Sequence, residues 1–198
     1  MNDEILTILA VALLVVVLPV ALLVWRVRRV RRMEAELYQY GARWGLAPGF
    51  GAAAVPYGMG SARNVHGVLA GVPVDVQHFI PYSMGRGPAP RPTTHVSAVP
   101  LRPIGGAVEI EHRDGASGRF DVDYQISSDA PHFARAFLTP ALQTAIAALP
   151  RHCVVRVGVS EIMMQPFVRV DLPGAFPPAA WLDCALRVVL IASLGYDP

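Results

Sequence analysis

The sequence contains no lysine, so arginine supplies all 17 of its basic residues. We interpret this exclusive use of arginine as the codon usage of a GC-rich genome. The competing explanation is that every one of these sites needs a planar guanidinium for bidentate phosphate binding. The arginines are not clustered in the way that such a function would require, apart from one group near the N-terminus.

Cysteine is scarce, with Cys153 and Cys184 as the only two. Neither belongs to a CxxC pair or to a Cys/His spacing typical of zinc sites. Cys184 lies in an apolar helical pattern and Cys153 begins an apolar strand pattern. We therefore interpret both as small core hydrophobes rather than as a nucleophile or a disulfide pair.

Recognisable catalytic and cofactor motifs are also missing. The six histidines show no HxxxH, HExxH or HxH spacing, and no serine lies in a GxSxG elbow. His78 and His95, which flank a Pro/Gly-rich stretch, are the one pair that a hairpin could bring together. The sequence therefore predicts no catalytic residue, no metal site and no cofactor, and it favours a protein that is not an enzyme.

Charge is unevenly distributed along the chain. Five arginines fall between residues 26 and 32, whereas from residue 44 onward 11 Arg balance 11 Asp plus Glu. Affinity for nucleic acid rests on clustered cations, so a neutral domain argues against a nucleic-acid partner.

One long uncharged run is present, from Ile5 to Trp25, with Thr7 as its one polar side chain. At 1.5 Å per residue, a helix of this length spans about 31 Å, which matches the hydrocarbon core of a bilayer. Asp3 and Glu4 precede the run, and five arginines follow it: Arg26, Arg28, Arg29, Arg31 and Arg32. This order is the reverse of a cleaved signal peptide. We predict residues 1–25 to be a short tail and a retained transmembrane helix in the plasma membrane, with the N-terminus outside and the C-terminal domain cytoplasmic.

The basic segment that follows, residues 26–44, is predicted to continue as an amphipathic helix. Its apolar residues recur at spacings of three and four, which places them on one face: Val30, Met33, Leu37, Tyr40 and Trp44. The stripe covers two heptads, which is short for a coiled coil. It can dock on the chain's own domain, form a homo-oligomer or lie on the lipid surface, and these alternatives stay open.

Residues 45–63 are rich in Gly, Ala and Pro and predict an irregular connector, and residues 64–198 predict one α+β domain. Alternating patterns indicate strands at 64–70, 72–80, 93–99, 107–112, 119–126, 153–160 and 163–172. Residues 81–92 predict a long loop. Helices are predicted from 130, from 140 to 149 and from 179 to 194, with Ser128 or Asp129 and Thr139 as N-caps and Gly195 closing the last one. Short links between strands favour a mainly antiparallel sheet with helices on one face.

The order of a spanning helix, an Arg-rich flank, hairpins and then the stretch FDVDYQISSDAPHFARAFLTPALQTAIAAL resembles a group of uncharacterised single-pass membrane-anchored proteins of high-GC bacteria. The resemblance is best over residues 120–195. It rests on caps, prolines and apolar spacing, so it implies a fold and a location but no activity.

The region also contains four carboxylates whose spacing predicts a shared face of the sheet. If the strands at 107–112 and 119–126 pair, Glu109, Glu111, Asp121 and Asp123 project from one outer face of the sheet. Like charges side by side destabilise a sheet, so something should offset them. Nearby arginines, a basic protein partner, a divalent cation or a catalytic acid/base pair are the alternatives.

The sequence therefore favours a membrane-tethered, non-enzymatic binding or scaffold module. Its surface for a protein partner would be the acidic face, the 81–92 loop or the juxtamembrane stripe. One alternative is an enzyme with a site assembled around the acidic face. The other is a homo-oligomeric envelope component joined through its N-terminal helices.

Overall fold

The structure is a computed structural model that describes residues 2–49, 60–81, 91–113, 117–160 and 164–195. The chain divides into two compact units, residues 1–37 and 38–198. Helix α1 (Asn2–Arg43) begins in the first unit and ends in the second.

Helix α1 is continuous through the predicted span and the basic segment, with Pro19 inside it. Within the part of the chain whose side chains are described, no helix is long and apolar enough to cross a membrane. The side chains of residues 5–14 and 16, which belong to the predicted span, lie outside that part.

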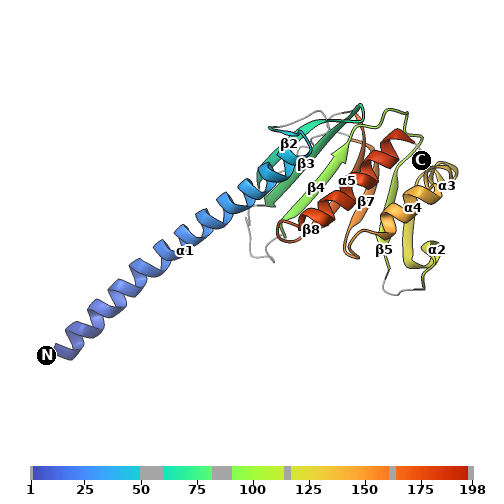
Figure 1. Ribbon diagram of the computed structural model, residues 1–198. Helices are drawn as coiled ribbons and strands as arrows, with labels where there is room; N and C mark the ends of the chain where they lie inside the picture. Colours follow the sequence, from blue (N-terminus) through green and yellow to red (C-terminus); the bar gives the residue numbers. More distant parts are fainter. Residues whose placement is uncertain (1, 50–59, 82–90, 114–116, 161–163, 196–198) are drawn as a thin grey trace. The chain divides into compact units, whose positions relative to one another are not determined.

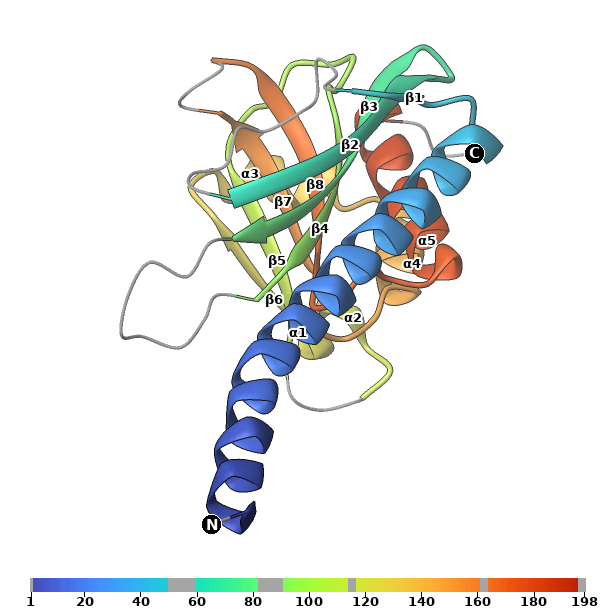
Figure 2. The same ribbon diagram turned by 90° about the vertical axis from the view of Figure 1, so that its left-hand side faces the viewer.

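The second unit is built on one antiparallel sheet, which confirms the predicted α+β class. Its eight strands lie in the order β1-β2-β3-β4-β8-β7-β5-β6, and every neighbouring pair is antiparallel. In the view of Figure 2, β2 and β3 lie in front of β7 and β8. The strands are β1 (Ala47–Pro48), β2 (Gly60–Leu69), β3 (Val72–Pro81), β4 (Thr93–Ala98), β5 (Val108–His112), β6 (Tyr124–Ser128), β7 (Val154–Val159) and β8 (Pro166–Pro173).

The core lies between this sheet and the C-terminal helices. The strand register places Val76, Val96, Val170, Val155 and Ile110 in one row across five strands, and all five are at most 1% exposed. Helix α5 (Ala179–Leu194) covers β3, β4 and β8 on this face and packs beside α4 (Pro140–Ala147), as Figure 1 shows. Helix α5, with α4 beside it, lies on one face of the sheet as the sequence predicted.

The opposite face of the middle strands is buried and polar. Its side chains alternate with the core valines, and Asp75, Gln77, His95, Ser97 and Asp171 are each less than 7% exposed. Buried polar groups need partners to offset their lost hydration. Ion pairs on this face, described below, supply such partners.

Two sequence predictions were wrong in local detail. Residues 120–123 form a short helix, α2 (Phe120–Asp123), so the predicted strand 119–126 begins only at Tyr124. The reason is local hydrogen bonding: the Asp123 carboxylate accepts from the Ser117 N–H at 2.7 Å and the Gly118 N–H at 2.9 Å. An Asp side chain that bonds to nearby backbone groups competes with a strand. In the connector, Ala47 and Pro48 pair with β2, and residues 50–59 lie outside the described residues.

Capping predictions had mixed outcomes. Thr139 caps α4 and Gly195 ends α5 in a left-handed conformation, as predicted. Helix α3 (Pro131–Phe137) begins after Ala130, which has no side-chain cap. Asp129 instead accepts from the Ala107 N–H at 2.6 Å, and Ser128 Oγ accepts from the Ala130 N–H at 3.0 Å. Both side chains therefore tie the start of α3 to its surroundings without capping it.

Replacing Thr139 with alanine should lower the free energy of unfolding by about 1 kcal/mol, because the Leu142 N–H loses the hydroxyl oxygen that it donates to. Thr144→Ala on the same helix is the matched control. The Thr144 hydroxyl donates to the Pro140 carbonyl within the helix, and alanine has the higher helix propensity. Equal losses in urea unfolding of the two variants would contradict the capping role.

Candidate functional site

The structure separates the four carboxylates that the sequence placed on one face. Glu109 and Glu111 do point to the same side of β5, away from the buried Val108 and Ile110. Asp121 and Asp123 belong to α2 and are not part of a strand. The predicted continuous acidic face is therefore wrong, because the short helix α2 replaces the first part of the predicted second strand.

Three of these carboxylates are offset by groups on the chain itself. Glu109 accepts from Arg156 Nε at 3.1 Å and from Nη2 at 3.3 Å, and Asp121 accepts from Arg119 Nη2 at 2.7 Å. The Arg156 hydrogen bond is the main reason that the pKa of Glu109 is lowered. The backbone N–H of Ser117 is the main reason that the pKa of Asp123 is lowered. In the described ranges, no three His, Cys, Asp or Glu residues are placed to hold a metal ion.

Most charged groups of the buried polar face join into one network across four strands, which we call the Asp171 network: Glu109, Arg156, Asp171, Arg169 and His95. Arg156 bridges Glu109 and Asp171. Arg169 Nε lies 2.8 Å from Asp171 Oδ1, and His95 Nδ1 lies 2.6 Å from the same oxygen. Asp171 is thus the common partner of three basic side chains.

Protonation in this network follows from burial and charge. Burial alone would raise the pKa of Asp171, but the His95 hydrogen bond and the arginine charges together lower it. Burial lowers the pKa of His95, and Arg169 and Arg156 oppose a further positive charge there. We infer an ionised Asp171 that accepts the Nδ1–H of a neutral His95, because an ionised carboxylate can only accept.

A His–Asp pair of this kind can position an imidazole for acid/base catalysis. Here, however, His95 and Asp171 are 6% and 5% exposed, and the carboxylate is shared among His95 and two arginines. An open groove of about 540 Å³ reaches the Glu109–Arg156 end of the network and passes between Ser127, Ser128 and Phe167. Because Glu109 is already paired in it, the geometry favours a structural role for the network.

His78 and His95 do not converge. They lie on adjacent strands but pair with Thr94 and Gln77, so their side chains are on opposite faces of the sheet. His78 Nδ1 is 2.8 Å from Thr94 Oγ1, on the face that α5 covers. Cys153 is buried, which raises the pKa of its thiol to about 12, and Cys184 is half-buried. A thiol with such a pKa is a poor nucleophile, in agreement with the predicted core role of Cys153.

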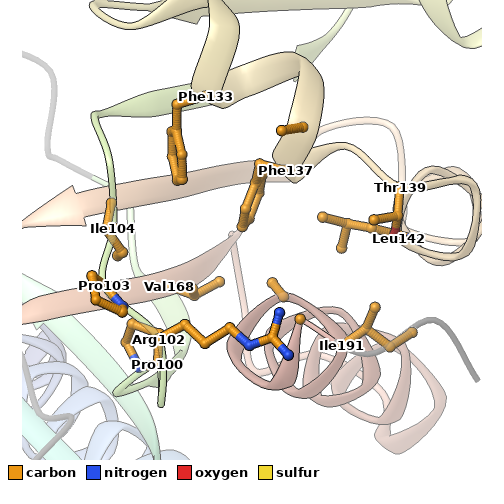
Figure 3. Close-up of a pocket in the computed structure, with 13 residues that line it drawn as sticks. Pro100, Arg102, Pro103, Ile104, Phe133, Phe137, Thr139, Leu142, Val168 and Ile191 are labelled. Atoms are coloured by element: carbon orange, nitrogen blue, oxygen red, sulfur yellow. Dashed lines mark hydrogen bonds between the residues drawn. The ribbon is translucent and has the colours of Figure 1, made fainter.

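The structure also contains an apolar pocket of about 200 Å³. Its walls come from residues 100–104, helix α3, the start of α4, strand β8 and the end of α5, as Figure 3 shows. Most of its lining side chains are apolar: Pro100, Pro103, Ile104, Phe133, Ala136, Phe137, Leu142, Val168, Ile191 and Ala192. Arg102 and Thr139 are the two polar side chains in the lining. Its apolar, partly enclosed walls make it a candidate site for binding a small molecule.

The end of the juxtamembrane stripe belongs to the second unit. Tyr40 is 3% exposed, and Trp44 Nε1 donates to Asp183 Oδ1 of α5 at 3.2 Å. Val30, Met33 and Leu37 belong to the first unit, as do the five basic residues 26, 28, 29, 31 and 32, and their roles stay predictions. Residues 82–90 of the proposed binding loop at 81–92 lie outside the described residues.

Searches against protein-family models, curated proteins and solved structures found no match. The candidate site therefore rests on geometry alone. Sequence reasoning missed Asp171, His95 and Arg156 as a unit, and it missed the pocket. Charged residues alternate with valines in PFVRVDLP, the sequence of β8, but this pattern is equally typical of a strand with one exposed face. No signal for the pocket is visible, because its lining comes from five separate segments.

Proposed function

We propose that this chain is a single-pass plasma-membrane protein whose C-terminal α+β domain is a non-enzymatic binding module on the cytoplasmic face. The observation that carries the membrane placement is the uncharged run from Ile5 to Trp25, directly followed by five arginines. Positive charge on one side of a span favours that side as cytoplasmic. The lipid bilayer is then the first partner of the chain.

The non-enzymatic part of the proposal is supported by the state of the ionisable groups. The buried Asp171 is paired with His95, Arg156 and Arg169, and Glu109 is paired with Arg156. A general acid or base needs a free proton-transfer position within reach of a substrate. In contrast, the apolar pocket offers walls suited to holding a ligand.

Topology can be tested with reporter fusions after Pro198. We expect a fused green fluorescent protein to fluoresce and a fused alkaline phosphatase to be inactive, since the first works in the cytoplasm and the second outside it. A charge-swapped variant, with the five arginines changed to Gln and with Asp3→Arg and Glu4→Arg, should shift both readouts toward the opposite topology. An active phosphatase on the unmodified chain would overturn the proposed orientation.

Activity can be tested on the full chain in lipid nanodiscs with a broad panel of hydrolase substrates. We expect no turnover above that of nanodiscs without protein. Turnover that Glu109→Gln abolishes while Asp121→Asn leaves it unchanged would favour an enzyme acting at the groove beside Glu109. It would contradict the non-enzymatic proposal.

A further inference from the structure

The apolar pocket has the size of a small ring or a short acyl chain. Its volume is about 200 Å³, and a cavity of about 150 Å³ lined by Leu, Ile and Phe is known to accept benzene. A body of about six to nine carbon atoms therefore fills it. Phe133 and Phe137 of α3 line the side of the pocket opposite Val168 and Ile191, as Figure 3 shows.

A single charged side chain lies on the rim of this pocket. Arg102 is exposed, and Figure 3 shows its guanidinium extended between Pro100 and Ile191. Among the described residues, no ion pair involves Arg102, whereas Arg43, Arg119, Arg156 and Arg169 each pair with an aspartate or glutamate. A pocket with apolar walls and one unpaired cation complements a ligand with an apolar body and one negative charge.

We propose that this pocket binds a small monocarboxylate whose body is an aromatic ring or a short, branched acyl chain. The body lies between Phe133, Phe137 and Leu142, and the carboxylate pairs with Arg102. A guanidinium matches the planar carboxylate and can donate two parallel hydrogen bonds to it. The inference deepens the proposed binding function by naming a ligand class, and it depends neither on the membrane anchor nor on its orientation.

The chain offers a second explanation for Arg102, which the experiment must separate. Arg102 Nη1 would lie 3.1 Å from a Cβ at Gly195, so the guanidinium is next to the C-terminal end of α5. A cation there stabilises the helix without any ligand. That role predicts an effect of Arg102 on stability but no preference for acids over neutral ligands of the same shape.

The test compares phenylacetate with its neutral isostere phenylacetamide, using isothermal titration calorimetry on the full chain in phosphatidylcholine nanodiscs. We expect saturable binding of phenylacetate with a Kd below about 1 mM and at least tenfold weaker binding of the amide. Arg102→Gln should weaken phenylacetate binding about tenfold and change amide binding less than about twofold. Titration of empty nanodiscs corrects for partitioning into the lipid.

Two further variants keep the result interpretable. Arg135→Gln removes an exposed charge from α3 outside the pocket lining, so it should leave both affinities unchanged. Ala192→Phe places a ring into the pocket and should abolish binding of both compounds. Far-UV circular dichroism of each variant verifies that the domain is folded.

Several results would overturn the proposal. They are equal affinities for the acid and the amide, equal losses of both on Arg102→Gln, binding that survives Ala192→Phe, and no saturable binding below 1 mM. Tighter binding of decanoate than of phenylacetate would also overturn it, since a chain of that length exceeds the pocket and indicates a lipid-binding surface. None of these results bears on the reporter fusions, so the membrane placement is tested separately.

Discussion

Replacing Asp171 with asparagine should lower the free energy of unfolding by about 3–5 kcal/mol. Asp171 is 5% exposed and is the shared partner of His95, Arg156 and Arg169. Asparagine fills the same space but removes the negative charge that lies between the largely buried Arg169 and the half-exposed Arg156. Removing one partner of a buried ionic cluster costs far more than the cluster contributes, because the remaining charges lose part of their compensation, although Arg156 keeps its pair with Glu109.

The matched control is Asp121→Asn, the same substitution in an exposed ion pair. The side chains of Asp121 and Arg119 are 67% and 70% exposed, so solvent screens the pair in the folded protein. We expect a loss of at most about 0.5 kcal/mol. Urea unfolding of the full chain in a mild detergent, followed by far-UV circular dichroism and tryptophan fluorescence, measures both variants. Losses of similar size would show that the Asp171 network is as well solvated as the surface pair.

Elements with strong local signals were predictable from the sequence. Helix α5 has prolines just before its start and Gly195 at its end, and α4 opens on Thr139 and Pro140. These residues act through backbone geometry within one turn, so a single sequence shows them. The strand predictions that follow Val/Ile alternation are also close to the observed bounds, as for β3 and β7.

The segment from residue 119 to residue 126 shows where alternation misleads. FDVDYQI alternates strictly, yet its first four residues form α2 because Asp123 binds the backbone of Ser117 and Gly118. The alternating pattern correctly predicted a shared face of a strand only for Glu109 and Glu111. A side chain that has a backbone partner a few residues away can override a strand pattern.

The ionic network could not be predicted because its members meet through strand order. Asp171 lies opposite His95 on one side and Val154 on the other, since β8 is inserted between β4 and β7. Glu109 reaches Arg156 because β5 pairs with β7 rather than with β4, which precedes it in the chain. A polar residue that alternates with valines is typical of a solvent-exposed face. Nothing local in β8 shows that both of its faces are buried.

Acid should destabilise the domain through His78, whose side chain is only 2% exposed. Burial, with a smaller contribution from the nearby His95, lowers the pKa of His78 from 6.5 to about 4. Below pH 6.5, His78 therefore binds a proton in the unfolded chain but not in the folded chain, so the free energy of unfolding falls as the pH falls. The loss is complete near pH 4 and amounts to about 3 kcal/mol, since each pKa unit corresponds to about 1.4 kcal/mol.

The variant His78→Asn isolates this contribution. Asparagine does not titrate, and its amide can take the place of His78 Nδ1 in the hydrogen bond to Thr94 Oγ1, which is 2.8 Å long in the wild type. We expect the difference in unfolding free energy between wild type and His78→Asn to change by about 3 kcal/mol in favour of the variant between pH 7.5 and pH 4. His132→Asn, at an exposed position of α3, should leave the acid sensitivity as it is. If the difference between wild type and His78→Asn stays constant across this range, His78 accepts its proton in the folded state as readily as in the unfolded chain. The buried face of the sheet beneath α5 would then accommodate a charged imidazole, contrary to this prediction.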